Sequence, residues 1–166
     1  MALTTTEMIE CLQNEVRILL HLATKVDRSK LDYRPTPKQR TTLEWLQYLT
    51  IMGPELMKGI KDLKFDGESW MRAEEAAKAR DFDQTVAELG KLNAVYASLA
   101  ELSDEDFRAE FEMFGAKYTR ASAVVNVIIC GHAAYRTQLF NHLKLCGREE
   151  LNTMNLWAGM DAPVPA

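Results

Sequence analysis

The sequence predicts an all-α protein, folded as an up-down-down-up four-helix bundle. Four segments of about 20 residues each carry apolar side chains at helical spacing, so each has one apolar stripe that needs a partner. The connection between the first two segments is short, which predicts antiparallel neighbours. The connection between the second and third is long enough to cross the whole bundle, so these two helices are expected to run parallel.

The length of 166 residues suits one domain of this kind. We expect residues 1–166 to form a single unit, with a helical core over about 5–147. The proline-rich end of the sequence predicts an extended tail over 148–166.

The first helix is predicted to begin at Thr4, because Thr4 and Glu7 have the spacing of a capping box. Its apolar positions follow at intervals of three and four residues, and Glu15 is the one charged residue inside that stripe. His21 lies on the polar side of the same helix and is predicted to be solvated.

The second helix is predicted to begin between Thr36 and Thr41, because Pro35 and Pro37 prevent a helical start further upstream. It ends at Asp66-Gly67. Tyr48 broadens its apolar face.

The long connection over 65–82 is predicted to be polar, with a short helix around Ser69–Ala79. A third helix is expected to begin near Asp83. The segment Ser103–Tyr118 is expected to be irregular, with a turn at Gly115.

The fourth helix is predicted over Val124–Gly147, with a cap near Thr119, and it carries two of the candidate site residues. At about 100° per residue its apolar stripe includes His132 and Tyr135, so both side chains are expected to face the core. Gly147 supplies a C-terminal stop.

Composition excludes several classes of protein. The formal net charge of −4 argues against a general nucleic-acid binder, which needs a basic face. No apolar run reaches the roughly 20 residues of a membrane span, and the N-terminus has no signal-peptide pattern. The three cysteines have no C-x-x-C spacing and are expected to be reduced thiols. We therefore expect a cytoplasmic protein with no membrane or nucleic-acid partner.

Two stretches resemble the DinB/YfiT-like family of metal-dependent four-helix bundles. They are Tyr33–Leu49 and His132–Leu139, the latter with the closing Gly147, and the resemblance covers roughly Thr5 to Gly147. It implies an up-down-down-up bundle, commonly a homodimer, with a divalent metal held by three histidines. Activities among relatives include thiol-cofactor S-transfer and isomerisation.

The positions that the resemblance matches to those histidines carry other residues. The position in the second helix is Tyr48, and the pair in the fourth helix is Gly131 and Tyr135, with His132 displaced by one residue. Zinc or nickel in such a site takes neutral imidazoles, whereas tyrosine coordinates well only as phenolate, with a pKa near 10. We expect the metal site to be degenerate, with His132 the single orthodox ligand.

Counting the helix rise per residue from one end of the bundle predicts that four candidate site residues lie at one level: Glu15, Tyr48, His132 and Tyr135. Asn93 and Tyr96 are expected near the same layer. One interpretation is a buried polar network, in which these groups satisfy one another. Another is a small-molecule pocket at the bundle centre, with His132 as general base, Glu15 orienting it, and Tyr48 or Tyr135 donating hydrogen bonds.

Two further alternatives concern the whole protein. It could be a metal-dependent thiol-cofactor S-transferase with altered ligands, including Glu15 or Glu44, or a non-catalytic dimeric binding protein. Arg136 and Gln138 match the family's arginine and glutamine, and Arg136 is expected to pair with a side chain of the first or second helix. The sequence identifies neither a substrate nor a cofactor.

Overall fold

Three of the long helices begin at a side chain that caps their first free amide groups. The structure, a computed structural model, describes residues 3–163. Helix α1 (Thr5–Ala23) follows Thr4, whose hydroxyl accepts from the Glu7 amide while the Glu7 carboxylate accepts from the Thr4 amide. Thr41 caps α2 (Thr42–Asp62), and Asp81 caps α4 (Phe82–Ala97), in the same reciprocal way.

The fourth rod of the bundle is built from three consecutive helical segments. They are α5 (Arg120–Ala123), a π-helical segment (Val124–Ile129) and α6 (Cys130–Leu145), beginning after the predicted cap at Thr119. Gly147, with φ of 98°, follows the end of α6, so the predicted C-terminal stop is confirmed.

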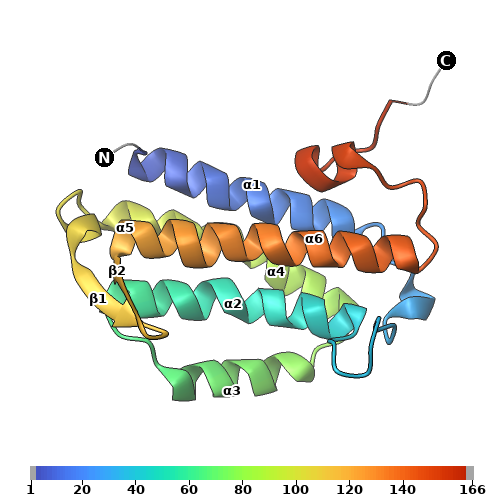
Figure 1. Cartoon of the computed structure of the whole chain (residues 1–166), viewed down its shortest axis with the longest axis horizontal. Coiled ribbons are helices and arrows are strands. Elements are labelled where there is room, and N and C mark those ends of the chain that lie inside the picture. Colours follow the sequence, from blue (N-terminus) through green and yellow to red (C-terminus); the bar gives the residue numbers. More distant parts are fainter. Residues whose placement is uncertain (1–2, 164–166) are drawn as a thin grey trace.

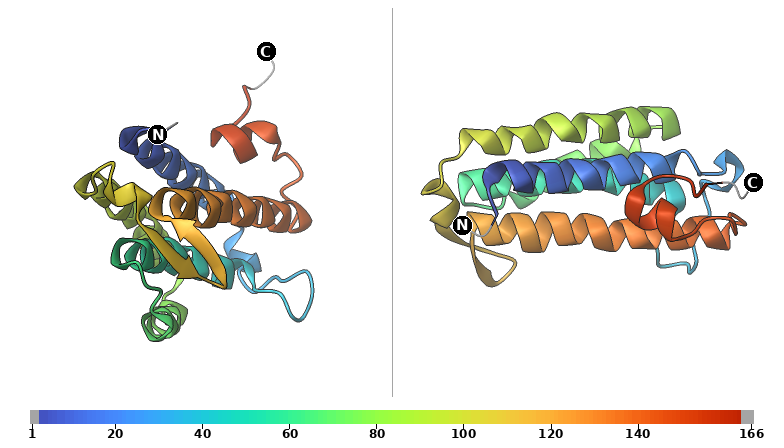
Figure 2. Two further views of the ribbon diagram at one scale, coloured as in Figure 1. Left: turned by 60° about the vertical axis from the view of Figure 1, so that its left-hand side comes forward. Right: turned by 90° about the horizontal axis from the view of Figure 1, so that it is seen from above.

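The direction of the helices is the predicted one. Helices α1 and α5–α6 run one way and α2 and α4 run the other way, which gives the up-down-down-up order (Figures 1 and 2). The long connection between α2 and α4 contains α3 (Gly67–Lys78), which packs on the outer side of α2. The predicted short helix in this connection is confirmed.

The core lies where α1, α2, α4 and α6 meet. Its fully buried side chains include Leu12, Leu19, Leu46, Leu49, Ile60, Leu89, Tyr96, Ile128 and Leu139.

No helix within residues 3–163 combines the length and the apolar character needed to cross a membrane.

The segment predicted to be irregular contains a β-hairpin, so that prediction was wrong. Strands β1 (Glu110–Met113) and β2 (Ala116–Thr119) pair antiparallel, with Phe111 opposite Tyr118. The turn between them contains Phe114 and Gly115, with φ of 54° and 75°, which confirms the predicted turn at Gly115. Phe111 and Met113 face the core at the period of two that a half-buried strand requires.

The tail beyond α6 had been predicted to be extended, and this prediction was wrong for part of it. The segment Met154–Ala158 forms a helical turn that packs against α1, and Asn155 within it is 2% exposed. Arg17 of α1 donates to the Ala158 carbonyl at 2.8 Å. The expectation for residues 164–166 lies outside the described part of the chain.

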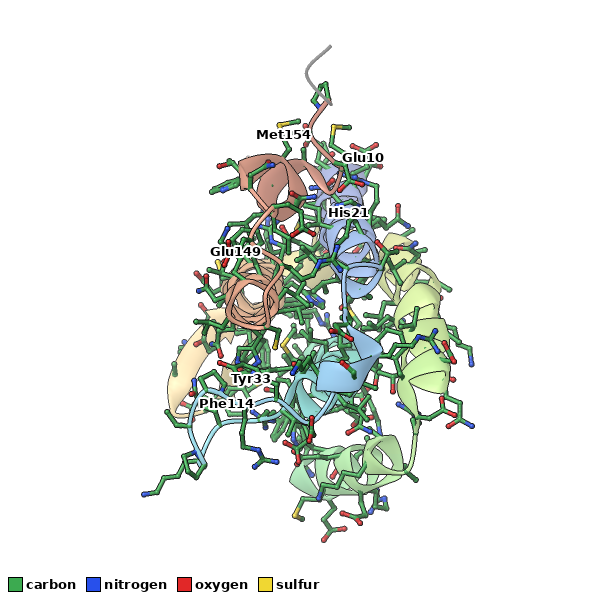
Figure 3. The ribbon with its side chains drawn as sticks, turned by 90° about the vertical axis from the view of Figure 1, so that its right-hand side faces the viewer. Glu10, His21, Tyr33, Phe114, Glu149 and Met154 are labelled. Atoms are coloured by element: carbon green, nitrogen blue, oxygen red, sulfur yellow. The ribbon has the colours of Figure 1, made fainter. Side chains whose placement is uncertain are left out.

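This tail also covers His21, which had been predicted to be solvated. His21 is labelled on α1 in Figure 3, and its side chain is only 15% exposed. Its Nε2 lies 3.1 Å from the Asn155 side-chain amide nitrogen. The prediction was wrong because the polar side of α1, read by itself, does not reveal that a distant segment folds back over it.

Candidate functional site

His132 lies inside the bundle and contacts Tyr96. Both side chains are fully buried, and the His132 Nε2 is hydrogen-bonded to the Tyr96 hydroxyl. A Cβ atom at Gly53 would come within 1.8 Å of that hydroxyl, so the close approach of Tyr96 to α2 requires glycine there. Burial, aided by the positive charge of Arg136, lowers the pKa of His132 to about 4, and the imidazole is therefore neutral at neutral pH.

Glu15 forms a separate ion pair with Arg136. The Arg136 Nε lies 3.3 Å from a carboxylate oxygen of Glu15, and both side chains are almost completely buried. Burial raises the pKa of Glu15 and the guanidinium partly offsets this effect. The expected pairing of Arg136 with a residue of the first or second helix is confirmed.

Tyr48 and Tyr135 form the third group, on the other side of α6. Their hydroxyl oxygens lie 3.3 Å apart and their ring centroids 5.1 Å apart. Trp45 and Trp70 pack against this pair, with Trp45 at 5.0 Å from Tyr135 and Trp70 at 5.9 Å from Tyr48. Burial, aided by the hydrogen bond to Tyr135, raises the pKa of Tyr48, so its phenol stays protonated at neutral pH.

These two tyrosines line a groove of about 740 Å³ between α2, α3, α6 and the tip of the β-hairpin. We call it the aromatic groove, and it is lined by Tyr48, Met52, Leu56, Phe65, Gly67, Trp70, Phe114, Val127, Gly131, Ala134, Tyr135 and Gln138. The three positions that the resemblance matches to the family's histidines, namely Tyr48, Gly131 and Tyr135, are all among them.

The four candidate residues had been expected to converge in one site, and this prediction was wrong. Tyr48 and Tyr135 meet each other, while His132 and Glu15 have partners elsewhere. Nor is the groove at the bundle centre, where Tyr96 and His132 lie. Tyr96 is in the expected layer, but Asn93 is exposed.

The expected stripe of the fourth helix was wrong at one turn. The buried face of α6 carries His132, Arg136, Leu139 and Leu143, while Tyr135 is only half-buried. Sequence periodicity favoured the aromatic Tyr135 over the charged Arg136 for the inner position. Arg136 is inside because Glu15 compensates its charge.

The side chains of the groove do not suit the metal that the resemblance implies. Tyr48 and Tyr135 offer phenols in place of imidazoles, and Gly131 offers no donor. Within residues 3–163, no three His, Cys, Asp or Glu side chains gather in a way that could hold a metal ion. Of the acidic residues considered as altered ligands, Glu15 pairs with Arg136 and Glu44 with Arg34.

Several residues of the groove were not predicted from the sequence. Trp70 and Gly67 come from α3, and Phe114 comes from the hairpin turn, which touches Phe65 with a centroid distance of 4.9 Å. The signal for Trp70 was a large aromatic residue in an otherwise polar connection. Only the path of that connection across α2 brings it to Tyr48.

Comparison by sequence gives no family, since no family profile and no curated protein matches the chain. Comparison of structures gives a clear likeness. The crystal structure of a DinB-like protein, YjoA, from Bacillus subtilis superimposes with a TM-score of 0.68 over 87% of this chain and 94% of that chain, at 15% sequence identity. The fold expected from the resemblance is confirmed: this chain has the fold of a DinB-like protein.

Proposed function

We propose that this protein binds a small, largely apolar organic molecule in the aromatic groove, without a metal ion at that position. The observation that carries the proposal is the identity of the residues at the three positions that the resemblance matches to the family's histidines. Tyr48, Gly131 and Tyr135 line one groove, and they make it apolar and aromatic rather than metal-coordinating.

The size and lining of the groove support this proposal. Its volume of about 740 Å³ is within the range typical of small-molecule sites, about 300–1,000 Å³. Such sites combine apolar walls with a few polar groups, and here those groups are Tyr48, Tyr135 and Gln138. Because the raised pKa of Tyr48 keeps its phenol protonated, the tyrosine pair can donate a hydrogen bond to a carbonyl or ether oxygen of the ligand.

In this proposal His132 and Glu15 are structural. Each is buried against a partner of its own, and neither lines the groove. The general-base role considered for His132 would require its imidazole to reach the ligand, and the neutral ring is instead hydrogen-bonded to Tyr96.

A dimeric assembly is a second, compatible proposal. Near the end of α6 and in the tail, Leu145, Trp157 and Met160 are between 50% and 68% exposed, and large apolar side chains at a surface favour a protein contact. Sedimentation equilibrium would test it. A monomer at all concentrations would contradict it, and a dimer weakened by Trp157→Ser would support it.

The test of the main proposal is a fluorescence titration with N-phenyl-1-naphthylamine, a neutral aromatic probe whose emission rises in apolar surroundings. Protein treated with a chelator and freed of metal should bind one probe per chain. Ala134, exposed at the wall of the groove, offers a blocking variant: Ala134→Trp should weaken binding about tenfold or more, because the indole fills space that the probe needs.

The matched control is Ala94→Trp, the same substitution at an exposed position of α4 that does not line the groove. It should bind the probe as the unmodified protein does. Equal binding by Ala134→Trp and Ala94→Trp, or binding that requires added zinc or nickel, would contradict the proposal.

A further inference from the structure

We propose that the ligand of the aromatic groove is an anionic amphiphile, whose apolar body lies in the groove and whose acidic group lies in a second, basic hollow next to it. This inference rests on the proposed function and adds the chemical class of the ligand. It arises from one residue, Tyr48, that belongs to both hollows.

The second hollow has a volume of about 250 Å³ and lies at the N-terminal end of α2. We call it the basic hollow. It is lined by Arg34, Lys38, Gln39, Arg40, Glu44, Gln47, Tyr48, Glu74, Ala77 and Lys78. Four of these side chains are cationic and two are anionic, in a protein whose formal net charge is −4. Positive charge is thus concentrated beside the groove against the overall charge of the chain.

The two hollows follow each other along α2. Glu44, Gln47 and Tyr48 line the basic hollow, and Tyr48, Met52 and Leu56 continue into the aromatic groove. On the antiparallel α3 the order is reversed, with Lys78 and Glu74 in the basic hollow and Trp70 in the groove. From Glu44 to Leu56 the helix rises by about 18 Å, so a molecule of about 10 to 18 Å could occupy both hollows.

The cations of the basic hollow are incompletely neutralised. Arg34 pairs with Glu44 at 3.4 Å and Arg40 with Glu74 at 3.6 Å, and Lys78 pairs with Glu75, which does not line the hollow. Lys38 is in none of the ion pairs formed within residues 3–163, which leaves it as the cation of the hollow without a carboxylate partner. An anion bound there would supply that partner.

Arg40 of the basic hollow contacts Tyr48, the residue that lines both hollows. Its guanidinium lies 4.1 Å from the ring centroid of Tyr48 and 5.3 Å from that of Trp45, so it is held over these two aromatic rings. Its ion pair with Glu74 is long and more than a third exposed on each side, a geometry worth little in water. The guanidinium can therefore exchange Glu74 for an acidic group of a ligand that passes Tyr48.

The experiment uses the naphthylamine probe in the groove and two competitors with the same alkyl chain, decanoate and decan-1-ol. The neutral alcohol measures apolar affinity alone. Decanoate should displace the probe at about tenfold lower concentration than decan-1-ol, and the preference should shrink as salt is added, because the added interaction is between charges.

The variant Lys38→Gln should abolish most of the preference for decanoate and leave displacement by decan-1-ol within about twofold, because the alcohol does not use the cation. Arg40→Gln should likewise reduce the preference for decanoate. The control, Lys91→Gln, makes the same change of charge on α4, where Lys91 is exposed and lines neither hollow. It should keep the preference.

The outcomes separate the two proposals. If the probe itself does not bind, the proposed function fails, and the inference fails with it. If the probe binds but decan-1-ol displaces it as well as decanoate does, or Lys91→Gln has the same effect as Lys38→Gln, the inference is overturned while the proposed function stands.

Discussion

The hydroxyl oxygens of Tyr48 and Tyr135 lie 3.3 Å apart, although 87 positions separate the two residues in the chain. The contact joins α2 to α6 at the wall of the aromatic groove, where the resemblance places two of the family's histidines. At these positions two phenols hydrogen-bond to each other, where the resemblance implies two imidazoles that share a metal ion.

If those positions retain the geometry of a metal site, histidines should restore it. The triple variant Tyr48→His, Gly131→His and Tyr135→His is expected to hold about one zinc ion per chain after dialysis, whereas the unmodified protein should hold none in the groove. A Cβ atom at Gly131 would lie 3.4 Å from the Met52 sulfur, an ordinary van der Waals distance. Elemental mass spectrometry measures the zinc content.

The control for that experiment is Tyr48→Phe with Tyr135→Phe, which removes the hydroxyls and adds no ligand. Zinc retained by the unmodified protein and lost in this control would show that the tyrosines themselves are ligands. A triple variant that folds but holds no zinc would mean that the three positions do not share a coordination sphere.

The buried pair of Glu15 and Arg136 should matter mainly through the charge that remains when one partner is lost. Arg136→Met and Glu15→Leu are each expected to lower the free energy of unfolding by about 3 kcal/mol, since each leaves a buried charge uncompensated. The double variant should recover most of that loss. Urea unfolding of the four proteins gives the double-mutant cycle, and additive losses would contradict the account.

His132 should make the protein sensitive to mild acid. Its pKa is about 4 in the folded state and 6.5 in the unfolded chain, so between these values the unfolded state binds a proton that the folded state does not. The stabilisation is present above pH 6.5 and falls as the pH decreases toward 4, by about 3 kcal/mol in total.

The measurement is urea unfolding at a series of pH values for the unmodified protein and for His132→Gln. The variant lacks the titrating group but keeps Glu15, whose own titration then contributes to both curves. The unmodified protein should lose the additional stability below pH 6.5. Parallel curves for the two proteins would mean that His132 has the same pKa in the folded and unfolded states, which would contradict the account.

Asn155 should fix the tail on α1. Its side-chain amide nitrogen donates to an Asp161 carboxylate oxygen at 2.8 Å and lies beside His21. Its side-chain carbonyl accepts from the Asn152 backbone N–H at 2.9 Å. Asn155→Ala is expected to cost about 1–2 kcal/mol, because it removes the hydrogen bonds of a buried side chain. Hydrogen exchange should then accelerate over 152–160 and not in α4, and unchanged exchange in the tail would contradict this role.

The helices could be predicted because their signals are local. The capping pair Thr4–Glu7 and the stop at Gly147 each depend on a few neighbouring residues, and the structure has both. Helix α2 begins after Thr41, at the end of the predicted range. The short connection before α2 and the long one after it were sufficient to give the order of the bundle.

The site was less predictable because it depends on pairings between distant segments. Arg136 faces the core only because Glu15 of α1 meets it there, and His21 is covered only because the tail returns to α1. His132 and Gly131 are neighbours in the sequence, so their positions differ by about 100° around the axis of α6. That rotation is enough to place His132 in the core and Gly131 in the groove. The hairpin was missed because Phe111 and Met113 form too short an alternating pattern to identify a strand.

The central claim is that the aromatic groove binds an organic ligand in metal-free protein, and nuclear magnetic resonance on isotope-labelled, chelator-treated protein tests it most directly. Titration with N-phenyl-1-naphthylamine should shift the indole signal of Trp70 and the backbone amides of Phe114, Gly131 and Tyr135 most strongly. Shifts confined to other surfaces, or shifts at these residues that begin only after zinc or nickel is added, would contradict it.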